Sequence, residues 1–527
     1  MNNQLSKRQL LLPVLLGAML AAGILIGSRL SNAPVSGNTN KINAVLNYIQ
    51  QEYVDTVNND QLVDISIEKI LEHLDPHSAY IPASEVASAN EPLEGNFEGI
   101  GIEFHIQQDT IMVVAALAGG PSEALGIQSG DRIIKVNDKT VAGVGITNDK
   151  VFKLLRGNGG TTVKVSLLRN GLQRLTDYTI TRGKIPIYSV DAAYMVDDKT
   201  GYIKISRFAE PTVEEFSKAC NSLKNQGMIK MILDLRGNPG GFLNAATELA
   251  DEFLDDKKLI VFTKGKSRPK TSYFAEKEGL FEKGKVVVLI DEGSASASEI
   301  LSGALQDWDR ATIIGRRSFG KGLVQEQTTF PDGSAMRLTI ARYYTPTGRS
   351  IQKSYANGFD AYNDELMTRY KHGEFVSADS VHLSDTITFT TPGGKKVYGG
   401  GGIMPDIFVP VDTTYDSEFL SAVLVAGLLN QFCYDYVDHN RSELNKYNSS
   451  KDFDSHCNAE PLLKDFVVFA ISKGVKSDPA AIYRSGIAIK TQLKALIARM
   501  IWKNEGMYPI LHQIDPAYKK AMQVINN

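Results

Sequence analysis

Cysteine is scarce in this sequence, and neither sign of charge is in excess. The 527 residues include 57 basic and 60 acidic side chains, which gives a formal charge of −3 at pH 7. This balance supplies neither a basic stripe for phosphate backbones nor an acidic tail, so we expect no nucleic-acid partner. The three cysteines have no CxxC spacing, and their odd number leaves at least one unpaired in any intramolecular disulfide scheme. We interpret Cys220, Cys433 and Cys457 as structural or incidental, with a Cys433–Cys457 bridge as the open alternative.

Motifs for metal and nucleotide chemistry are also missing. The sequence contains no HExxH metal motif, no GxxxxGK[ST] phosphate loop and no GxGxxG dinucleotide loop. We therefore expect no metal and no other cofactor. Only eight histidines are present, and no GxSxG or other histidine-paired serine motif accompanies them. His77 lies in the turn of LDPHSAY, where we interpret it as a hydrogen-bonded structural group rather than a catalytic one.

One long hydrophobic run is present, and it lies near the amino terminus. Residues 10–27 (LLLPVLLGAMLAAGILIG) are enough to cross a bilayer core as a helix, at about 1.5 Å per residue. The preceding Lys7 and Arg8 favour an N-in orientation, and the lack of a clear A-x-A site favours an uncleaved signal anchor over a removed signal peptide. We therefore expect residues 1–30 to form a membrane anchor, with the rest of the chain exported. A buried core helix is the alternative.

Hydrophobic periodicity divides the remaining chain into four regions. Residues 41–95 have helical spacing, and residues 96–184 alternate apolar and polar side chains as short strands do. Strands and helices alternate over residues 185–415, which is typical of a layered α/β core. Residues 416–527 are helical again. We therefore expect a multidomain α/β protein in which a β-rich module precedes the α/β core, with helical regions at both ends and a polar insertion at Lys353–Val381.

The β-rich module resembles a PDZ domain. Its sequence GIGIEFHI is followed by SEALGIQSGDRIIKVN, which is typical of such domains. The resemblance implies a carboxylate-binding loop made of Gly99, Ile100, Gly101 and Ile102. Successive backbone N–H groups in such a loop can hold a carboxylate, while an edge strand adds a peptide by β-augmentation.

Three serines alternate with alanines in DEGSASASEI, between an apolar strand and a helical segment. Ser296 and Glu299 match the Ser-x-x-Glu capping box, so a structural role as the helix N-cap is open to this serine. The same helix end would favour an oxyanion that forms beside a nucleophilic serine. The local sequence alone leaves both roles open.

A nucleophilic serine needs a base, and lysine is an alternative to histidine. Lys321 follows a strand, in the glycine-flanked turn of GRRSFGKGLVQ. To act as a base its amine must be neutral, so burial or a neighbouring cation must lower its pKa, and Arg316 and Arg317 are the candidate cations. Amide donors for an oxyanion would come from the glycine-rich loop Leu235–Gly241, which lies between a strand and a helix.

Seven signatures occur in one order: LDPHSAY, the PDZ-like module, LDLRGNPGG, GSASASEI, GRRSFGKGLVQ, ARYYTPTGRSIQ and GGIMPDI. Over residues 42–411 they resemble the carboxyl-terminal processing proteases, or tail-specific proteases, of peptidase family S41. The resemblance implies that the middle serine, Ser296, is the nucleophile and that Lys321, 25 residues later, is the base. Ser294 and Ser298 would then let the turn pack tightly and satisfy local amides.

The same resemblance implies the remaining site residues. Gln325 would orient the Lys321 amine by hydrogen bonding, and the oxyanion donors would be the backbone amides of Ala297 and Gly240. The PDZ module would capture the free C-terminus of a substrate and swing relative to the core, to open or complete the active site. Arg156 matches a PDZ arginine that responds to bound substrate in related enzymes; a solvated cation at a helix end is the alternative.

The sequence therefore predicts a membrane-anchored serine endopeptidase of the cell inner membrane, with its catalytic region on the periplasmic side and with protein C-termini as its substrates. By analogy, the helical terminal regions suggest a homodimer, and an adaptor protein is an open further partner. Two other functions stay open. One is a PDZ adaptor on a catalytically silent protease scaffold, against which the intact set Ser296, Lys321, Gln325 and GNPGG argues. The other is an acyl hydrolase or hydratase, for which a peptide-tail clamp would be useless.

Overall fold

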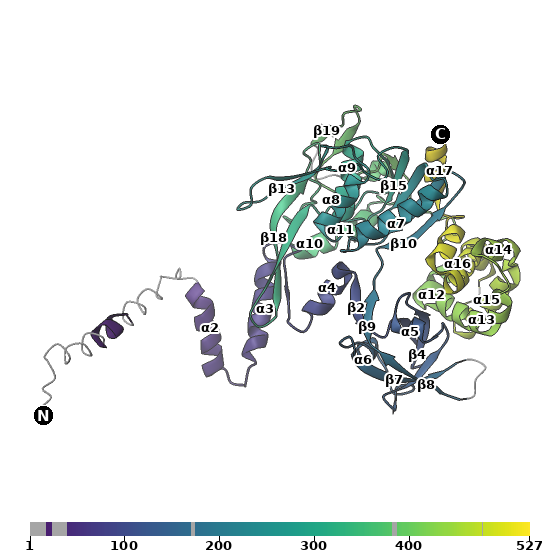
Figure 1. Cartoon of the computed structure of the whole chain (residues 1–527), viewed down its shortest axis with the longest axis horizontal. Helices are drawn as coiled ribbons and strands as arrows, with labels where there is room; N and C mark the ends of the chain where they lie inside the picture. The colour runs from purple at the N-terminus through teal and green to yellow at the C-terminus, as the bar shows by residue number, and fades with distance from the viewer. Residues whose placement is uncertain (1–16, 24–38, 170–173, 382–386, 477) are drawn as a thin grey trace, which may run out of the picture. The chain divides into compact units, whose positions relative to one another are not determined.

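The computed structural model describes residues 17–23, 39–169, 174–381, 387–476 and 478–527 (Figure 1). The chain divides into two compact units, Met1–Leu74 and Asp75–Asn527. Most of the predicted membrane anchor lies outside the described residues. Within the described part of the chain, no single helix is long and apolar enough to span a membrane, although the bent pair Glu418–Val425 and Leu428–Leu444 passes the same length and composition test together.

Among the described residues of the first unit, residues 17–23 are helical, and two longer helices follow, α2 (Thr39–Glu52) and α3 (Asn59–Glu72). Asn58 begins α3 as its N-cap, since its side-chain oxygen accepts a hydrogen bond from the Gln61 amide at 3.2 Å. Apolar side chains at helical spacing line a groove between the two helices; they include Ile42, Val45, Leu46, Ile49, Leu62 and Ile70. The helical periodicity of this part of the sequence therefore corresponds to real helices.

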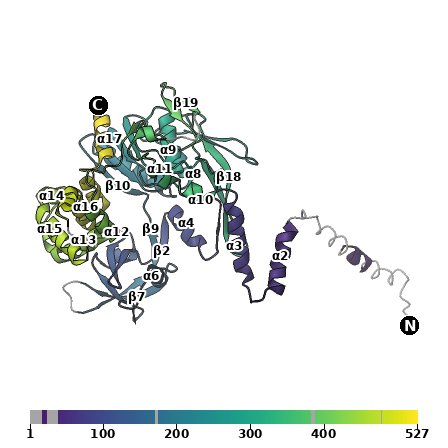
Figure 2. The same ribbon diagram turned by 180° about the vertical axis from the view of Figure 1, so that it is seen from behind.

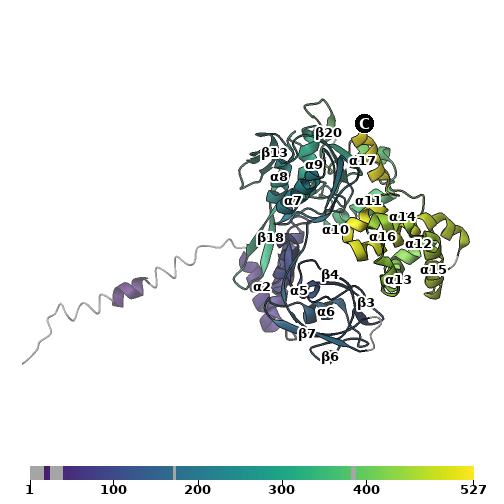
Figure 3. The ribbon, with the colours of Figure 1, turned by 45° about the vertical axis from the view of Figure 1, so that its right-hand side comes forward.

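The second unit begins with β1 (Ala79–Ile81) and α4 (Val86–Glu94), followed by the β-rich module. The module contains β2 (Asn96–Gly99), β3 (Ile102–Gln107), β4 (Thr110–Ala116), α5 (Pro121–Ala124), β5 (Arg132–Val136), β6 (Lys139–Thr140), α6 (Asn148–Leu155), β7 (Thr162–Leu168), β8 (Thr176–Thr181) and β9 (Gly183–Pro186). Its sheet has the order β3-β4-β5-β7-β8, with β6 paired to β5. Figure 3 shows strands β3, β4, β6 and β7 of the module gathered with α5 and α6. Alternate strand residues such as Ile111, Val113 and Val165 pack with Val151 of α6 in the core of the module.

The α/β core is built on a second sheet with the order β10-β11-β12-β15-β16-β21. The pairs from β11 onward are parallel, and only the edge pair β10/β11 is antiparallel. The strands are β10 (Val190–Met195), β11 (Thr200–Ile205), β12 (Lys230–Asp234), β15 (Lys285–Ile290), β16 (Thr312–Gly315) and β21 (Ile407–Phe408). The helices that follow strands of this sheet are α7 (Thr212–Asn225), α8 (Leu243–Asp251) and α9 (Ala297–Asp307).

Helices cover both faces of this sheet, which explains why its strands are nearly continuous apolar runs. Ile203, Leu233 and Val288 belong to the core that contains α7, α8 and α9. Their neighbours Tyr202 and Ile232 face the opposite side, where α17 (Pro516–Asn526) packs against the sheet. The layered α/β prediction is confirmed.

A five-stranded sheet lies beside this core and carries the segment after the lysine loop. Its order is β1-β18-β13-β14, and β17 pairs with β18 as an antiparallel hairpin. The strands are β13 (Leu259–Lys264), β14 (Thr271–Phe274), β17 (Leu323–Thr329) and β18 (Ala335–Tyr344). A separate hairpin consists of β19 (Thr388–Thr390) and β20 (Lys396–Tyr398).

The polar insertion folds as α10 (Phe359–Asn363), α11 (Glu365–Lys371) and the short 3₁₀ helix η1 (Ala378–Ser380). Four of its charged residues form ion pairs in which they are buried or half-buried; these are Lys353, Glu365, Arg369 and Glu374. Glu374 pairs with Arg369 at 2.8 Å and with Arg317 of the protease core at 2.7 Å. These pairs explain how a polar segment can be packed onto the core, because buried charges persist where they are paired.

The C-terminal helices α12 to α16 gather in one bundle (Figure 2). They are α12 (Glu418–Val425), α13 (Leu428–Leu444), α14 (Ser450–His456), α15 (Ala459–Ser472) and α16 (Pro479–Leu511). All three cysteines are free thiols, so the alternative of a Cys433–Cys457 bridge is wrong. Cys433 lies instead in the apolar core of the bundle, with its sulfur 3.6 Å from the Leu493 carbonyl. The predicted fold class, with a PDZ-like module before the core and helical terminal regions, is confirmed.

Candidate active site

Ser296 lies at the junction of strand β15 and helix α9 and is the N-cap residue of this helix. Its φ and ψ angles are 55° and −112°, outside the regions that L-residues ordinarily adopt. The two flanking serines are buried: Ser294 donates to the Leu235 carbonyl and Ser298 donates to the Asn238 carbonyl, each at 2.9 Å. Both hydroxyls therefore donate to carbonyls of the loop Leu235–Gly241, and the Ser294 hydroxyl also accepts from the Asp291 amide at 3.0 Å, which is the expected local contact. The strained conformation belongs to Ser296.

The carboxylate of Glu299 ties the serine turn to the lysine loop. One oxygen accepts from the Ser296 amide at 2.8 Å and from the Lys321 amide at 2.9 Å. The other oxygen accepts from the Gly320 amide at 2.8 Å and from the Ser318 hydroxyl. Burial raises the pKa of Glu299 to about 7, although these hydrogen bonds lower it. The sequence indicated the capping role of Glu299. It did not indicate the contacts of Glu299 with the lysine loop, because that loop is distant along the chain.

The surroundings of Lys321 lower the pKa of its amine. Its Nζ donates a hydrogen bond to Gln325 Oε1 at 3.1 Å. Burial lowers the pKa of the Lys321 amine, and the positive charge of Arg337 lowers it further. The candidate cations Arg316 and Arg317 each form an ion pair with a glutamate, and neither is among the charges that lower the pKa of Lys321. The lysine is therefore desolvated, as predicted, and the cation that lowers its pKa is Arg337 of β18.

Gln325 is held by the LDPHSAY segment. Its Nε2 donates to the backbone carbonyl of His77, and His77 Nε2 lies 2.7 Å from the Tyr362 hydroxyl. Burial lowers the pKa of His77 to about 4, and the charge of Lys321 lowers it further, so the imidazole is neutral near pH 7. The prediction that His77 is hydrogen-bonded is confirmed.

The glycine-rich loop comes against the serine turn at Gly240. The φ of Gly240 is +98°, and a Cβ added there would lie 2.7 Å from the Ala295 carbonyl and 2.8 Å from the Ala297 nitrogen. Only glycine allows this approach. Ala297 is the first residue of α9, where amides lack intrahelical partners. The Gly240 amide donates to Asn238 Oδ1 at 2.9 Å, so in this conformation it is engaged.

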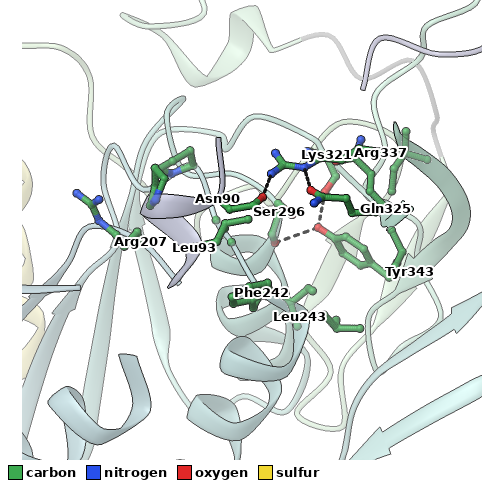
Figure 4. Close-up of a pocket in the computed structure, with 18 of the residues that line it drawn as sticks. Asn90, Leu93, Arg207, Phe242, Leu243, Ser296, Lys321, Gln325, Arg337 and Tyr343 are labelled. Carbon is green, nitrogen blue, oxygen red and sulfur yellow. Dashed lines mark hydrogen bonds between the residues drawn. The ribbon is translucent and has the colours of Figure 1, made fainter. Parts of the chain in front are cut away.

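Ser296, Lys321, Gln325 and Gly240 line a single cavity of about 830 Å³ (Figure 4). Such a volume accommodates several side chains of a peptide. Ile300, Leu323 and Tyr343 also line the cavity and belong to the serine, lysine and ARYYTPTGRSIQ motifs. The other lining residues come from segments without a recognisable motif; they include Asn90, Leu93, Arg207, Phe242, Leu243 and Arg337. Nothing in the local sequence marks these positions, because the fold brings them to the cavity from separate elements. Across the described residues, no three or more His, Cys, Asp or Glu side chains gather as a metal site would require.

The predicted carboxylate-binding loop lies between β2 and β3, outside the set of residues that line this cavity. Gly101 has a φ of +76°, and a Cβ added there would lie 3.2 Å from the Gly120 Cα. The Gly101 carbonyl accepts from the Leu117 amide at 3.0 Å, and the Ile100 carbonyl accepts from Ser122. The loop is therefore a tightly packed turn that depends on glycine.

Arg156 lies next to this loop, since a Cβ added at Gly99 would be 3.5 Å from the Arg156 Cα. Its guanidinium pairs with Glu91 of α4, with N–O distances of 2.9 and 2.7 Å. It also lies over the rings of Phe97 and Phe152, 5.1 and 4.8 Å from their centroids. Arg156 is therefore paired and packed in this conformation, and does not line the cavity around the serine.

Three family models match parts of the chain: peptidase family S41 over residues 199–359, a PDZ domain over residues 112–169, and a family of unknown function over residues 419–503. The carboxy-terminal processing protease CtpA of Bacillus subtilis is 34% identical over 384 residues, which are 73% of this chain and 80% of CtpA. A probable CtpA-like serine protease of Staphylococcus aureus is 36% identical over 358 residues, 66% of this chain and 71% of that protein. The solved photosystem II D1 C-terminal processing protease matches 60% of this chain and 91% of its own, at 28% identity and a TM-score of 0.34.

Proposed function

The chain belongs to peptidase family S41 as a carboxy-terminal processing serine protease with a PDZ domain, and from this premise we propose that Ser296 is its nucleophile and Lys321 its general base. One observation carries the proposal: a strained serine, a lysine amine whose pKa burial lowers, and a glutamine bonded to that amine line the same cavity. A Ser-Lys pair performs acyl transfer without histidine or metal.

In the proposed reaction, the neutral Lys321 amine removes the proton of the Ser296 hydroxyl as the serine oxygen attacks the scissile carbonyl carbon. The resulting ammonium then gives this proton to the leaving amine, and water hydrolyses the acyl-serine ester by the same route. Gln325 keeps the amine oriented through both steps, which its hydrogen bond to Lys321 supports.

The tetrahedral intermediate would be stabilised by backbone amides. The Ala297 amide, at the positive end of α9, is the first donor. Gly240 is the second, once its amide leaves Asn238 Oδ1. A small rotation of the glycine-rich loop would make this exchange, and it is a step that substrate binding could drive.

The PDZ domain would select substrates by their free C-termini. The loop at Gly99, Ile100, Gly101 and Ile102 would hold the terminal carboxylate. Strand β3 pairs only with β4 among the described strands, so its other edge can receive an extended peptide. Arg156 packs directly against this loop. Binding of the tail would therefore break the ion pair between Arg156 and Glu91.

We also propose that the enzyme is exported and anchored in the inner membrane by residues 10–27, with the PDZ and catalytic regions on the periplasmic side. The apolar run and the preceding Lys7 and Arg8 support this orientation. Added protease should degrade the enzyme in spheroplasts but spare it in intact cells. A homodimer and an adaptor protein are further proposed partners; light scattering and capture by a tagged Ser296→Ala variant would test them.

The test of the dyad uses the full chain and a model protein that ends in an apolar tail, with mass spectrometry of the products. Wild type should cleave, whereas Ser296→Ala and Lys321→Ala should each lose activity by about 10⁴-fold or more, with unchanged circular dichroism. Amidation of the tail should remove cleavage, because the carboxylate is then lost. Undiminished turnover by Ser296→Ala would exclude this serine, and tail binding without cleavage by any of the three would favour the silent adaptor.

A further inference from the structure

We propose that Tyr362, in the polar insertion, is a positioning residue for the catalytic lysine. This inference rests on the proposed function of Ser296 and Lys321. Tyr362 touches neither of these side chains through a hydrogen bond, and acts through His77 and Gln325. It gives the insertion a role in the reaction that its sequence does not suggest.

The contact begins at the Tyr362 hydroxyl, which lies 2.7 Å from His77 Nε2 with the two rings edge to face at 5.2 Å. Burial raises the pKa of the Tyr362 phenol and lowers that of His77 to about 4. Near neutral pH the phenol therefore carries its proton and the imidazole is neutral. With both groups neutral, one hydrogen bond joins the hydroxyl and Nε2 and, together with the edge-to-face contact of the rings, holds the imidazole in one orientation.

From His77 the contact continues through the backbone. The His77 carbonyl accepts a hydrogen bond from Gln325 Nε2, and Gln325 Oε1 accepts from Lys321 Nζ at 3.1 Å. Since a Gln side chain has one donor end and one acceptor end, fixing the donor on His77 presents the oxygen to the lysine. The orientation of Gln325 is therefore set by the position of the His77 peptide group, which Tyr362 holds from the other side.

Tyr362 is itself held firmly by the insertion. The Lys353 ammonium lies 4.0 Å from the centroid of the Tyr362 ring and 3.9 Å from that of Phe319. Lys353 also pairs with Glu365 of α11 at 3.0 Å, and both Lys353 and Tyr362 are buried. A buried phenol that is fixed at its ring by Lys353 and at its hydroxyl by His77 can hold the catalytic segment in place, as a side chain on a mobile loop could not.

The consequence concerns the protonation of Lys321. The charged groups that face its amine are Arg337 of β18, which lowers the pKa, and Asp75 and Glu299, which raise it; burial is the largest cause and lowers it. Without the Tyr362 hydroxyl, the His77 segment and Gln325 can move and admit water to the amine. The pKa of Lys321 then rises toward its ordinary value, and less of the lysine is neutral near pH 7.

The experiment is a pH profile of tail-dependent cleavage by the full chain, comparing wild type with Tyr362→Phe. The variant keeps the ring and its contact with Lys353 and removes only the hydroxyl. We expect kcat near pH 7 to fall by roughly tenfold, the scale of one hydrogen bond, with KM for the tailed substrate unchanged. The rising limb of the profile should move to higher pH, so that activity recovers in alkaline buffer. A merely structural role would lower the melting temperature or the active fraction without moving this limb.

Tyr370→Phe is the matched control, since this tyrosine lies in the same insertion on α11 and its side chain is exposed. It should leave the profile in place. His77→Gln tests the same link from the other partner, and the double variant with Tyr362→Phe should be no worse than either single variant. If the losses of the two single variants add up in the double variant, the inference about Tyr362 is overturned. It is also overturned if Tyr362→Phe has the pH profile of wild type while Ser296→Ala is inactive, and in both cases the proposed function stands. Full activity of Ser296→Ala would instead overturn the proposed function.

Discussion

At the residue scale, Glu299 links the two halves of the candidate dyad. It lies in the first turn of α9 and is fully buried, yet its carboxylate reaches across to the lysine loop. The Ser296 and Lys321 amides share one of its oxygens. The segments of the nucleophile and the base are thus joined by a single side chain from the first turn of α9, so that a change at Glu299 should disturb both.

We predict that Glu299→Gln destabilises the protein by roughly 2 to 4 kcal/mol, because one carboxylate oxygen becomes an NH₂ group that faces two donors and leaves them unsatisfied. Urea unfolding at pH 7, followed by fluorescence, measures the difference. Glu248→Gln is the control: Glu248 lies on α8 and is exposed, and its replacement should change the free energy of unfolding by less than about 0.5 kcal/mol. Equal stability of the two variants would show that the four hydrogen bonds of Glu299 contribute little.

The sequence allowed only part of this site to be predicted. Ser296, Lys321 and Gln325 lie in short motifs with fixed spacing, and the structure brings them into one cavity. Arg337 and Tyr362 could not be found in this way, because no local pattern distinguishes a cation on β18 or a tyrosine of the insertion from others like them. Their roles arise from pairing between β17 and β18 and from packing of a distant segment.

At the element scale, apolar strands that alternate with helical stretches were enough to predict the layered core, because strands covered on both faces are nearly continuous apolar runs. The sequence pattern did not indicate that two loops approach each other closely at the edge of the central sheet. The glycine-rich loop after β12 and the serine turn after β15 meet at Gly240, where a Cβ would lie 2.8 Å from that of Ser296. Parallel neighbours place their carboxyl ends at one edge, which is where both loops begin.

We predict that Gly240→Ala lowers kcat by about 100-fold or more, because the new methyl group displaces the serine turn and the oxyanion donors. The measurement is kcat and KM with the tailed substrate, beside the melting temperature. Gly394→Ala is the matched control: its φ is +84°, similar to the +98° of Gly240, but an added Cβ there meets no atom within 4 Å. Both variants share the strain of a left-handed residue, so only the difference between them reports the approach of the loops. Full activity of Gly240→Ala would refute a need for this contact in catalysis.

At the scale of the whole molecule, the C-terminal bundle packs against the PDZ domain, a contact that separate sequence patterns could not have indicated. The Tyr434 ring of α13 stacks on His105 of β3, with centroids 4.4 Å apart and an angle of 16°. Tyr434 also packs with Met112 and Val114 of β4. Because side chains of a strand alternate, these residues occupy the face of the sheet opposite the PDZ core. The bundle thus supports the strand that is proposed to receive the peptide.

We predict that Tyr434→Ala loosens this support, because a large buried ring is lost and a cavity remains, at a cost of about 3 kcal/mol. Hydrogen exchange should become faster in β3 and β4 while the strands of the α/β core keep their protection. Tyr436→Ala is the control: this tyrosine is on the same helix but packs within the bundle, against Phe432. Its loss should speed exchange in α13 to α16 more than in β3. If both variants speed exchange in the PDZ strands alike, the contact acts through the stability of the whole bundle. If only Tyr434→Ala does so, the bundle holds the PDZ domain directly, and the affinity of the PDZ domain for the tail should fall in this variant.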